Sequence, residues 1–351
     1  MAGMKRPLYL SGGGAVTPGG LDLRQTLAAI RAGLSAFEEE FLVEPFADTQ
    51  LIARVPTHYQ LRRTQGTWLL NLAERAISEA LRSGSASAQE TALLIATPES
   101  FRKHPAFDDV PLAGFLPALT RQMGVTFHAA SRVVDGGAAA NVGLIERAAE
   151  ILEAQGARQV LLGGVDSFLN DGDLARLRDA KRLAGGENAQ GLVPGEAAAF
   201  ARITLAPEAA GAVVPAIRGL GVAQEADSVL SDRTSQGRGL LAALRAATAS
   251  PGPGEPDISF VVSNSNGERF SGLEQLIARA RFYQTRRELL ATCYPAMTVG
   301  DVGAASGALA LLVAADSIAR DYAPGPVAMC EVASEAGTRA AAAVFGMRRA
   351  A

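Results

Sequence analysis

The chain has 351 residues, of which 48% are hydrophobic, and a formal net charge of −3. This length favours about two domains, and the balanced charge gives no sign of a nucleic-acid or membrane-surface partner. Two cysteines without a CxxC spacing and three histidines offer no disulfide framework and no metal site. No apolar stretch reaches the length of a membrane-spanning helix, and the N-terminus has too short an apolar run for a signal peptide, so we expect a cytoplasmic protein. We also expect no cofactor.

Hydrophobic periodicity divides the first half of the chain into strands and helices. The Gly-rich segment 12–19 is expected to be a tight loop, and the segment 37–61, of mixed polarity, a surface excursion. The expected elements are a strand at 8–11, helices from about 23 and at 67–81, a strand at 91–96, a helix at 112–123, a short strand at 133–134, a helix through 142–152, and strands at 159–162 and 199–203.

The second half repeats part of this order. The small-residue segment 205–213 is the expected boundary, which divides the chain into halves at 1–207 and 208–351. Beyond it we expect strands at 217–222 and 258–262, helices at 239–247, 273–281 and 308–319, and a strand at 327–330. Since a small-residue turn, a helix and a strand follow one another in both halves, the pattern predicts an α/β fold built from two similar halves.

The segment 133–166 is a strand, turn, helix and strand of the parallel-sheet type. It resembles the nucleophile-bearing unit of the thiolase superfamily, in particular the β-ketoacyl synthases, in which an Ala-Cys-Ala-Ser run opens the helix and a Gly-Gly pair follows the next strand. When Gly163 and Gly164 are placed on that pair, the family's cysteine falls on Ala138. A thiol at a helix N-terminus has a lowered pKa and is a good nucleophile, whereas alanine offers no lone pair.

Further motifs of the family follow in order along nearly the whole chain. They are the opening Gly-x-Gly-x-Val-Thr-Pro-x-Gly at 12–20, the Gly-Glu turn that contains Glu196, the segment 299–307, which matches Gly-His-x-x-Gly-Ala-Ala-Gly, and the segment 334–339 in place of a Gly-Phe-Gly-Gly-Thr-Asn loop. The resemblance implies a thiolase-like fold with a layered αβαβα core. For Glu196 we favour a carboxylate that binds backbone amides of a buried turn over a catalytic role.

Carried over position by position, the family's two active-site histidines fall on Asn264 and Asp301. Asn266, Gly337 and Thr338 are further candidates for the pocket. Condensation needs a thiolate to carry the acyl chain and two imidazoles to stabilise the developing negative charge. Asn264 could donate a hydrogen bond to a carbonyl oxygen, but an ionised Asp301 would repel an enolate. We therefore expect no β-ketoacyl synthase activity.

Asp301 has two interpretations. It is either a general base in a buried pocket, with its pKa raised by desolvation, or an N-cap for a helix that begins near Gly303. We favour the cap. Cys293 and Cys330 could be displaced nucleophiles, but neither stands at a recognisable helix start, and buried thiols are the preferred interpretation.

Three functional hypotheses follow from the resemblance. The first is a non-catalytic homologue that binds an acyl group, acyl-CoA, an acyl carrier protein or a partner subunit, as the chain length factors of polyketide synthases resemble synthases without the cysteine. The second is a thioester hydrolase or acyltransferase that uses Asp301 and Asn264. The third is an accessory protein of a secretion system, similar to short thiolase-like proteins of type VI secretion. In all three we expect a homodimer that pairs through a strand next to the helix that begins near Ala138.

Overall fold

The computed structural model describes residues 6–41, 49–56, 64–186, 188–208, 213–231, 233–249 and 251–348. Its strands are β1 (Leu8–Val16), β2 (Glu38–Phe41), β3 (Thr49–Ile52), β4 (Thr91–Thr97), β5 (Arg132–Asp135), β6 (Gln159–Ser167), β7 (Glu196–Thr204), β8 (Val213–Gln224), β9 (Phe260–Ser263), β10 (Ala291–Cys293), β11 (Val327–Ala333) and β12 (Thr338–Arg348). Its α-helices are α1 (Leu23–Ala32), α2 (Gln65–Arg82), α3 (Leu112–Met123), α4 (Gly137–Gly143), α5 (Ile145–Ala154), α6 (Asp171–Asp179), α7 (Arg238–Ala247), α8 (Arg269–Phe282), α9 (Ala296–Val299) and α10 (Ser306–Ala319).

Ten of these strands form one mixed sheet, in the order β10-β9-β11-β12-β8-β1-β7-β6-β4-β5. The five strands of each half follow the same pattern, because β5-β4-β6-β7-β1 matches β10-β9-β11-β12-β8 strand for strand. The two sets meet where β1 pairs antiparallel with β8, at Leu8 and Ile217. This repeat confirms the expected α/β fold of two similar halves. The boundary at 207 stays a prediction, since residues 209–212 lie outside the described part of the chain.

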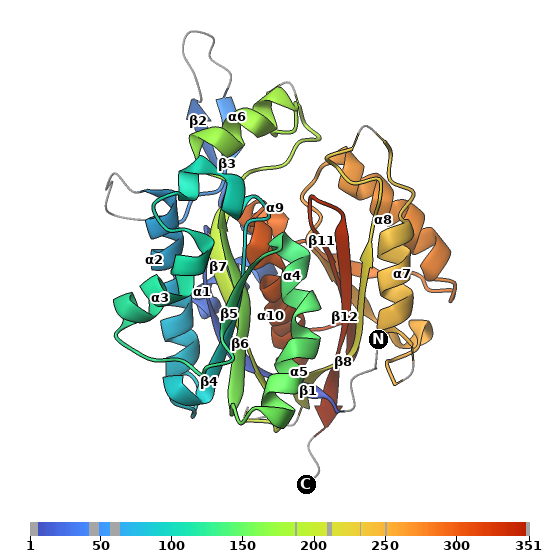
Figure 1. Ribbon diagram of the computed structural model, residues 1–351. Helices are drawn as coiled ribbons and strands as arrows, with labels where there is room; N and C mark the ends of the chain where they lie inside the picture. Colours follow the sequence, from blue (N-terminus) through green and yellow to red (C-terminus); the bar gives the residue numbers. More distant parts are fainter. Residues whose placement is uncertain are drawn as a thin grey trace.

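The helices form layers on and between the two halves of the sheet (Figure 1). The helices α2 and α3 cover the outer face of the N-terminal half, and α7 and α8 cover that of the C-terminal half. Between them lie α4 and α10, and α10 contacts strands of both halves. Most side chains of α10 are buried, from Ser306 to Ala314 without interruption. A helix that is apolar all round belongs in such a position, which gives the αβαβα layering.

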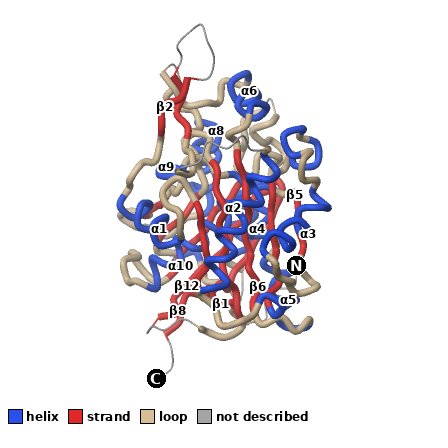
Figure 2. The backbone as a smooth tube through the Cα atoms, turned by 90° about the vertical axis from the view of Figure 1, so that its left-hand side faces the viewer, coloured by secondary structure: helices blue, strands red, loops and turns tan. Residues whose placement is uncertain are grey.

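A small hairpin of β2 and β3 stands at the same end of the molecule as α6, as the view turned by 90° also shows (Figure 2). This hairpin replaces part of the surface excursion expected at 37–61, of which residues 42–48 and 57–61 lie outside the described residues. Within the described residues, no helix is long and apolar enough to span a membrane.

Several element boundaries differ from those expected from the sequence. The glycines at 12–14 continue β1 instead of forming a loop, and Gly163 and Gly164 lie inside β6 instead of after it. A Cβ at Gly164 would overlap the carbonyl group of Ala304, so this glycine lets the turn before α10 approach the sheet closely. The predicted helix through 142–152 is interrupted at Leu144, between α4 and α5.

The last strand, β12, is absent from the sequence-based prediction. Its run of four alanines at 340–343 has high helix propensity. The segment is nevertheless extended because it pairs antiparallel with both β11 and β8, and all four alanines are fully buried. Tertiary pairing therefore overrides local propensity at this segment.

Candidate functional site

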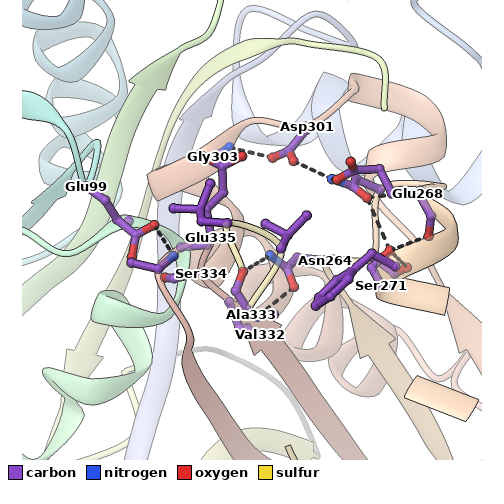
Figure 3. Close-up of a pocket in the computed structure, with 18 of the residues that line it drawn as sticks. Glu99, Asn264, Glu268, Ser271, Asp301, Gly303, Val332, Ala333, Ser334 and Glu335 are labelled. Carbon is purple, nitrogen blue, oxygen red and sulfur yellow. Dashed lines mark hydrogen bonds between the residues drawn. The ribbon is translucent and has the colours of Figure 1, made fainter. Parts of the chain in front are cut away.

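A cavity of about 340 Å³ lies where the carboxyl ends of strands from both halves converge (Figure 3). Its walls come from the residues that follow β4, β6, β9 and β11, from the start of α4, and from the turn before α10. Convergence at the carboxyl ends of strands is the usual position of ligand sites in α/β proteins. The sequence could not give the size of this cavity, but its position follows from the strand order.

The structure brings four of the predicted site residues into this one cavity. Ala138, Asn264, Asn266 and Asp301 all line it, although they are up to 163 residues apart in the sequence. Gly337 and Thr338 are not among the lining residues. They belong to the turn into β12, where the Thr338 hydroxyl is hydrogen-bonded to Gln224 Oε1 at 3.3 Å.

Ala138 is in the first turn of α4 and is 5% exposed. The start of this helix is held by Ser334, whose Oγ accepts the Ala139 amide at 2.9 Å and donates to the Gly136 carbonyl at 3.1 Å. Ser334 thus satisfies one of the amides that a helix start leaves without a partner. At position 138 only a methyl group is available to the cavity.

Asn264 extends the pairing between β9 and β11. Its Nδ2 donates to the Ala333 carbonyl at 2.9 Å, and its Oδ1 accepts the Ala333 amide at 2.9 Å. The side chain therefore forms two hydrogen bonds with the backbone of one residue, Ala333, of the neighbouring strand. From the sequence, Asn264 could donate to a carbonyl oxygen, but in the structure its amide group joins the two strand ends.

Asp301 is a partly buried carboxylate with two hydrogen bonds. Its Oδ1 accepts the Gly303 amide at 3.0 Å, and its Oδ2 accepts a hydrogen bond from Asn266 Nδ2 at 2.7 Å (Figure 3). Gly303 begins a short 3₁₀ turn, Gly303–Ala305, ahead of α10, so the contact is of the capping kind. Burial raises the pKa of Asp301 to about 6, a value that is also suitable for a general base.

Asp166, at the end of β6, is a cavity residue that sequence reasoning missed. It is 3% exposed, and its Oδ2 accepts the Ala304 amide at 2.8 Å. Burial raises the pKa of Asp166 well above its ordinary value, and the nearby Asp173 and Asp301 raise it further. An acidic residue two positions after Gly164, inside a buried strand, was the signal in the sequence that could have identified it.

Apart from Glu99, the other charged side chains of the cavity form ion pairs. Arg182 contacts Glu268 at 2.6 Å and Glu335 at 2.6 Å, and Arg176 reaches Asp173 at 3.1 Å. In contrast, Glu99, Asp166 and Asp301 form no ion pair within the described residues. The cavity therefore carries more carboxylates than guanidinium groups, and its polar part favours neutral or cationic groups over anionic ones.

The remaining candidates of the sequence analysis lie outside the cavity. Cys330 is buried in β11, and Cys293 is half-buried at the end of β10. Burial raises the pKa of both thiols, to about 11 for Cys293, so neither is an activated nucleophile. Glu196 accepts the Val55 amide at 3.1 Å and the Trp68 indole N–H at 2.7 Å, in agreement with the structural role favoured for it. No cluster of possible metal ligands occurs among the described residues.

No protein-family model matches the sequence, and no curated protein matches it significantly. Similarity to solved structures is extensive. The chain aligns with the ketosynthase ApeO in complex with its chain length factor ApeC from Xenorhabdus doucetiae at a TM-score of 0.75 and 14% identity, over 97% of this chain and 98% of that one. It aligns with the ishigamide ketosynthase/chain length factor at a TM-score of 0.78 and 16% identity, over 97% and 99%.

A ketosynthase from module 6 of the bacillaene synthase of Bacillus subtilis 168 is also similar, with a TM-score of 0.76 and 13% identity, over 98% of this chain and 73% of that one. Identities this low establish the fold alone. The fold is the thiolase-like fold of the ketosynthases and chain length factors, over essentially the whole chain.

Proposed function

We propose that the protein is a non-catalytic, ketosynthase-like subunit that works by pairing with another subunit. One observation carries the proposal. In the cavity where the carboxyl ends of the strands converge, the first turn of α4 presents only the methyl group of Ala138, and carboxylates outnumber guanidinium groups among the lining residues. A site of this kind has no group to carry an acyl chain and nothing to stabilise an enolate.

The resemblance to complexes supports the pairing role. One of the similar structures is a ketosynthase in complex with its chain length factor, and another combines an acyl carrier protein with its ketosynthase, at a TM-score of 0.77 and 14% identity. By analogy, this chain would occupy the position of the subunit that shapes a complex without performing the chemistry. Binding of an acyl group or a carrier protein is compatible with the same cavity.

The pairing surface that we propose is β5. This strand is at one end of the ten-stranded sheet, and among the described residues only β4 pairs with it, which leaves its other edge free. A free strand edge offers backbone donors and acceptors to a second strand. Its neighbour in sequence is α4, so the surface adjoins the cavity. A second copy of this chain is the expected occupant, and a related ketosynthase subunit is the alternative.

The test is the mass of the purified protein by native mass spectrometry and light scattering. We expect a dimer of two 36.3 kDa chains for the wild type, a monomer for Val134→Arg in β5, and a dimer for Thr292→Arg, a matched change in β10 at the opposite end of the sheet. If the wild type is monomeric both alone and when co-expressed with a ketosynthase, or if both variants remain dimeric, pairing through β5 is wrong.

A second function has one observation in its favour. Asp301 has a pKa of about 6 inside a cavity, as a general base for thioester hydrolysis requires. Hydrolysis would release free thiol from acyl-CoA, and the activity would be lost in Asp301→Asn while binding remained. If the wild type steadily releases free thiol from acyl-CoA and Asp301→Asn does not, the non-catalytic proposal is wrong and hydrolysis takes its place.

A further inference from the structure

Glu99, which follows β4 and Pro98, is one of the residues that line the cavity (Figure 3). Its side chain lies against Gly137, the first residue of α4. A Cβ added at Gly137 would come within 2.6 Å of Glu99 Cγ and 3.2 Å of Ser334 Oγ. Gly137 also has a φ of +62°, which disfavours a side chain. Glu99 is therefore packed against the peptide that precedes Ala138.

The carboxylate of Glu99 also binds the turn between β11 and β12. Its Oε2 accepts the Ala336 amide at 2.9 Å. Burial raises the pKa of Glu99, and the negative charge of Glu335 adds to this effect. No arginine or lysine forms an ion pair with Glu99 among the described residues. A partly buried carboxylate without a paired cation depends on hydrogen bonds for its stabilisation, and the Ala336 amide supplies one of them.

We propose that Glu99 is a built-in occupant of the cavity, which takes both the amide donor of the β11–β12 turn and the space beside Ala138 that an acyl group would need. The inference rests on the proposed non-catalytic function and deepens it. The loss of a nucleophile at position 138 and the filling of the space beside it are then two parts of one change. A thiol restored at position 138 would react more slowly for as long as Glu99 is present.

The expected effect is electrostatic and steric. A carboxylate next to a thiol disfavours the thiolate, and each unit by which the thiol pKa rises lowers the reactive fraction at neutral pH about tenfold. Glu99→Gln removes the charge and keeps the size of the side chain, whereas Glu99→Ala clears the space as well. Removal of the charge in Glu99→Gln should be enough to let a small reagent react with the thiol. A bulky acyl group should also need the space that Glu99→Ala opens.

The experiment places a thiol at position 138 with Ala138→Cys and measures its alkylation by iodoacetamide against pH, by mass spectrometry of the peptide that contains it. Cys293 and Cys330, whose pKa values are raised by burial, are internal references. We expect Ala138→Cys/Glu99→Gln to react about tenfold faster at neutral pH than Ala138→Cys alone. The matched control is Ala138→Cys/Glu335→Gln, because Glu335 lines the same cavity but is paired with Arg176 and Arg182.

A second arm uses hexanoyl-CoA. The new thiolate at position 138 attacks the thioester carbonyl, a bond forms between its sulfur and the acyl carbon, and the bond from that carbon to the CoA sulfur breaks. The CoA thiolate leaves and takes up the proton that the new thiol released. We expect acylation of the protein in Ala138→Cys/Glu99→Ala and at least tenfold less in Ala138→Cys, with thermal unfolding used to confirm that each variant is folded.

Two results would overturn the inference: equal alkylation of the new thiol with and without Glu99, or equal acceleration by Glu99→Gln and Glu335→Gln. A different result would contradict the proposed non-catalytic function. That result is release of free thiol from hexanoyl-CoA by the wild-type chain, which has no thiol at position 138. If Glu99→Gln does not fold, Glu99→Ala gives the same comparison.

Discussion

Replacement of Asp301 with asparagine tests the electrostatics of the cavity most directly. Desolvation of this partly buried carboxylate raises its pKa from 3.8 to about 6. A shift of about two units corresponds to about 3 kcal/mol between the protonated and ionised forms. Because the folded-state pKa lies above the unfolded one, the proton stabilises the fold. This stabilisation is fully present below about pH 4 and is lost as the pH rises through about 6.

Asparagine resembles the protonated acid, since it has one acceptor oxygen and one donor group and carries no charge. Asp301→Asn should therefore remove the penalty that ionisation imposes above pH 6. We expect the variant to be more stable than the wild type by about 1–3 kcal/mol at about pH 7.5. The expected gain in stability is smaller than the energy that corresponds to the whole pKa shift, because the substitution weakens one of the hydrogen bonds to Gly303 and Asn266. The loss of this hydrogen bond costs about 1 kcal/mol. At about pH 4 the difference should nearly vanish.

The assay is urea unfolding followed by circular dichroism at several pH values between about 4 and 8. Asp108→Asn, at an exposed position, is the matched control and should show no such dependence on pH. The reasoning is refuted if Asp301→Asn is less stable than the wild type at the upper end of this range. In that case the hydrogen bonds to the ionised carboxylate would outweigh its burial.

Two further predictions concern stability. Arg339 and Glu274 form a fully buried ion pair, with a second contact at 2.9 Å, so Arg339→Met should destabilise the protein by about 3–5 kcal/mol in urea unfolding. Arg339→Met/Glu274→Leu should recover most of that stability. If it does not, the unpaired charge of Glu274 is not the cause of the destabilisation. Gly164→Ala should destabilise by more than about 2 kcal/mol because its Cβ would overlap Ala304. Gly272→Ala, in α8 with open space around it, should stabilise by up to about 1 kcal/mol, and similar losses in both variants would argue against close packing at Gly164.

The elements that the sequence predicted best are those whose hydrophobic period agrees with their final environment. The helix expected at 112–123 is found at Leu112–Met123, because its apolar face is buried and Gly124 ends it in a left-handed conformation. The strand expected at 91–96 is nearly the observed Thr91–Thr97. The alanine-rich β12 could not be predicted in the same way, since only its pairing with two distant strands makes it extended.

The candidate site shows the same division between local and distant information. Motif spacing was enough to select Ala138, Asn264 and Asp301, which line one cavity. Spacing could not show that the Asn264 amide is bound to the backbone of β11, or that the Glu99 carboxylate accepts the Ala336 amide, because these contacts join residues 69 and 237 positions apart. The ionisation behaviour of Asp301 likewise depends on burial, and burial is a property of the folded chain.

The charges around Ala138 indicate how far this cavity is from one that supports condensation. Two unit charges at about 4 Å interact by about 4 kcal/mol at the effective dielectric constant typical of proteins. Each ionised carboxylate near a developing enolate would thus slow its formation by roughly two to three orders of magnitude. Glu99, Asp166 and Asp301 all line the cavity without an ion-pair partner among the described residues. We therefore expect that a thiol and two imidazoles placed at positions 138, 264 and 301 would not restore condensation while Glu99 remains in the cavity.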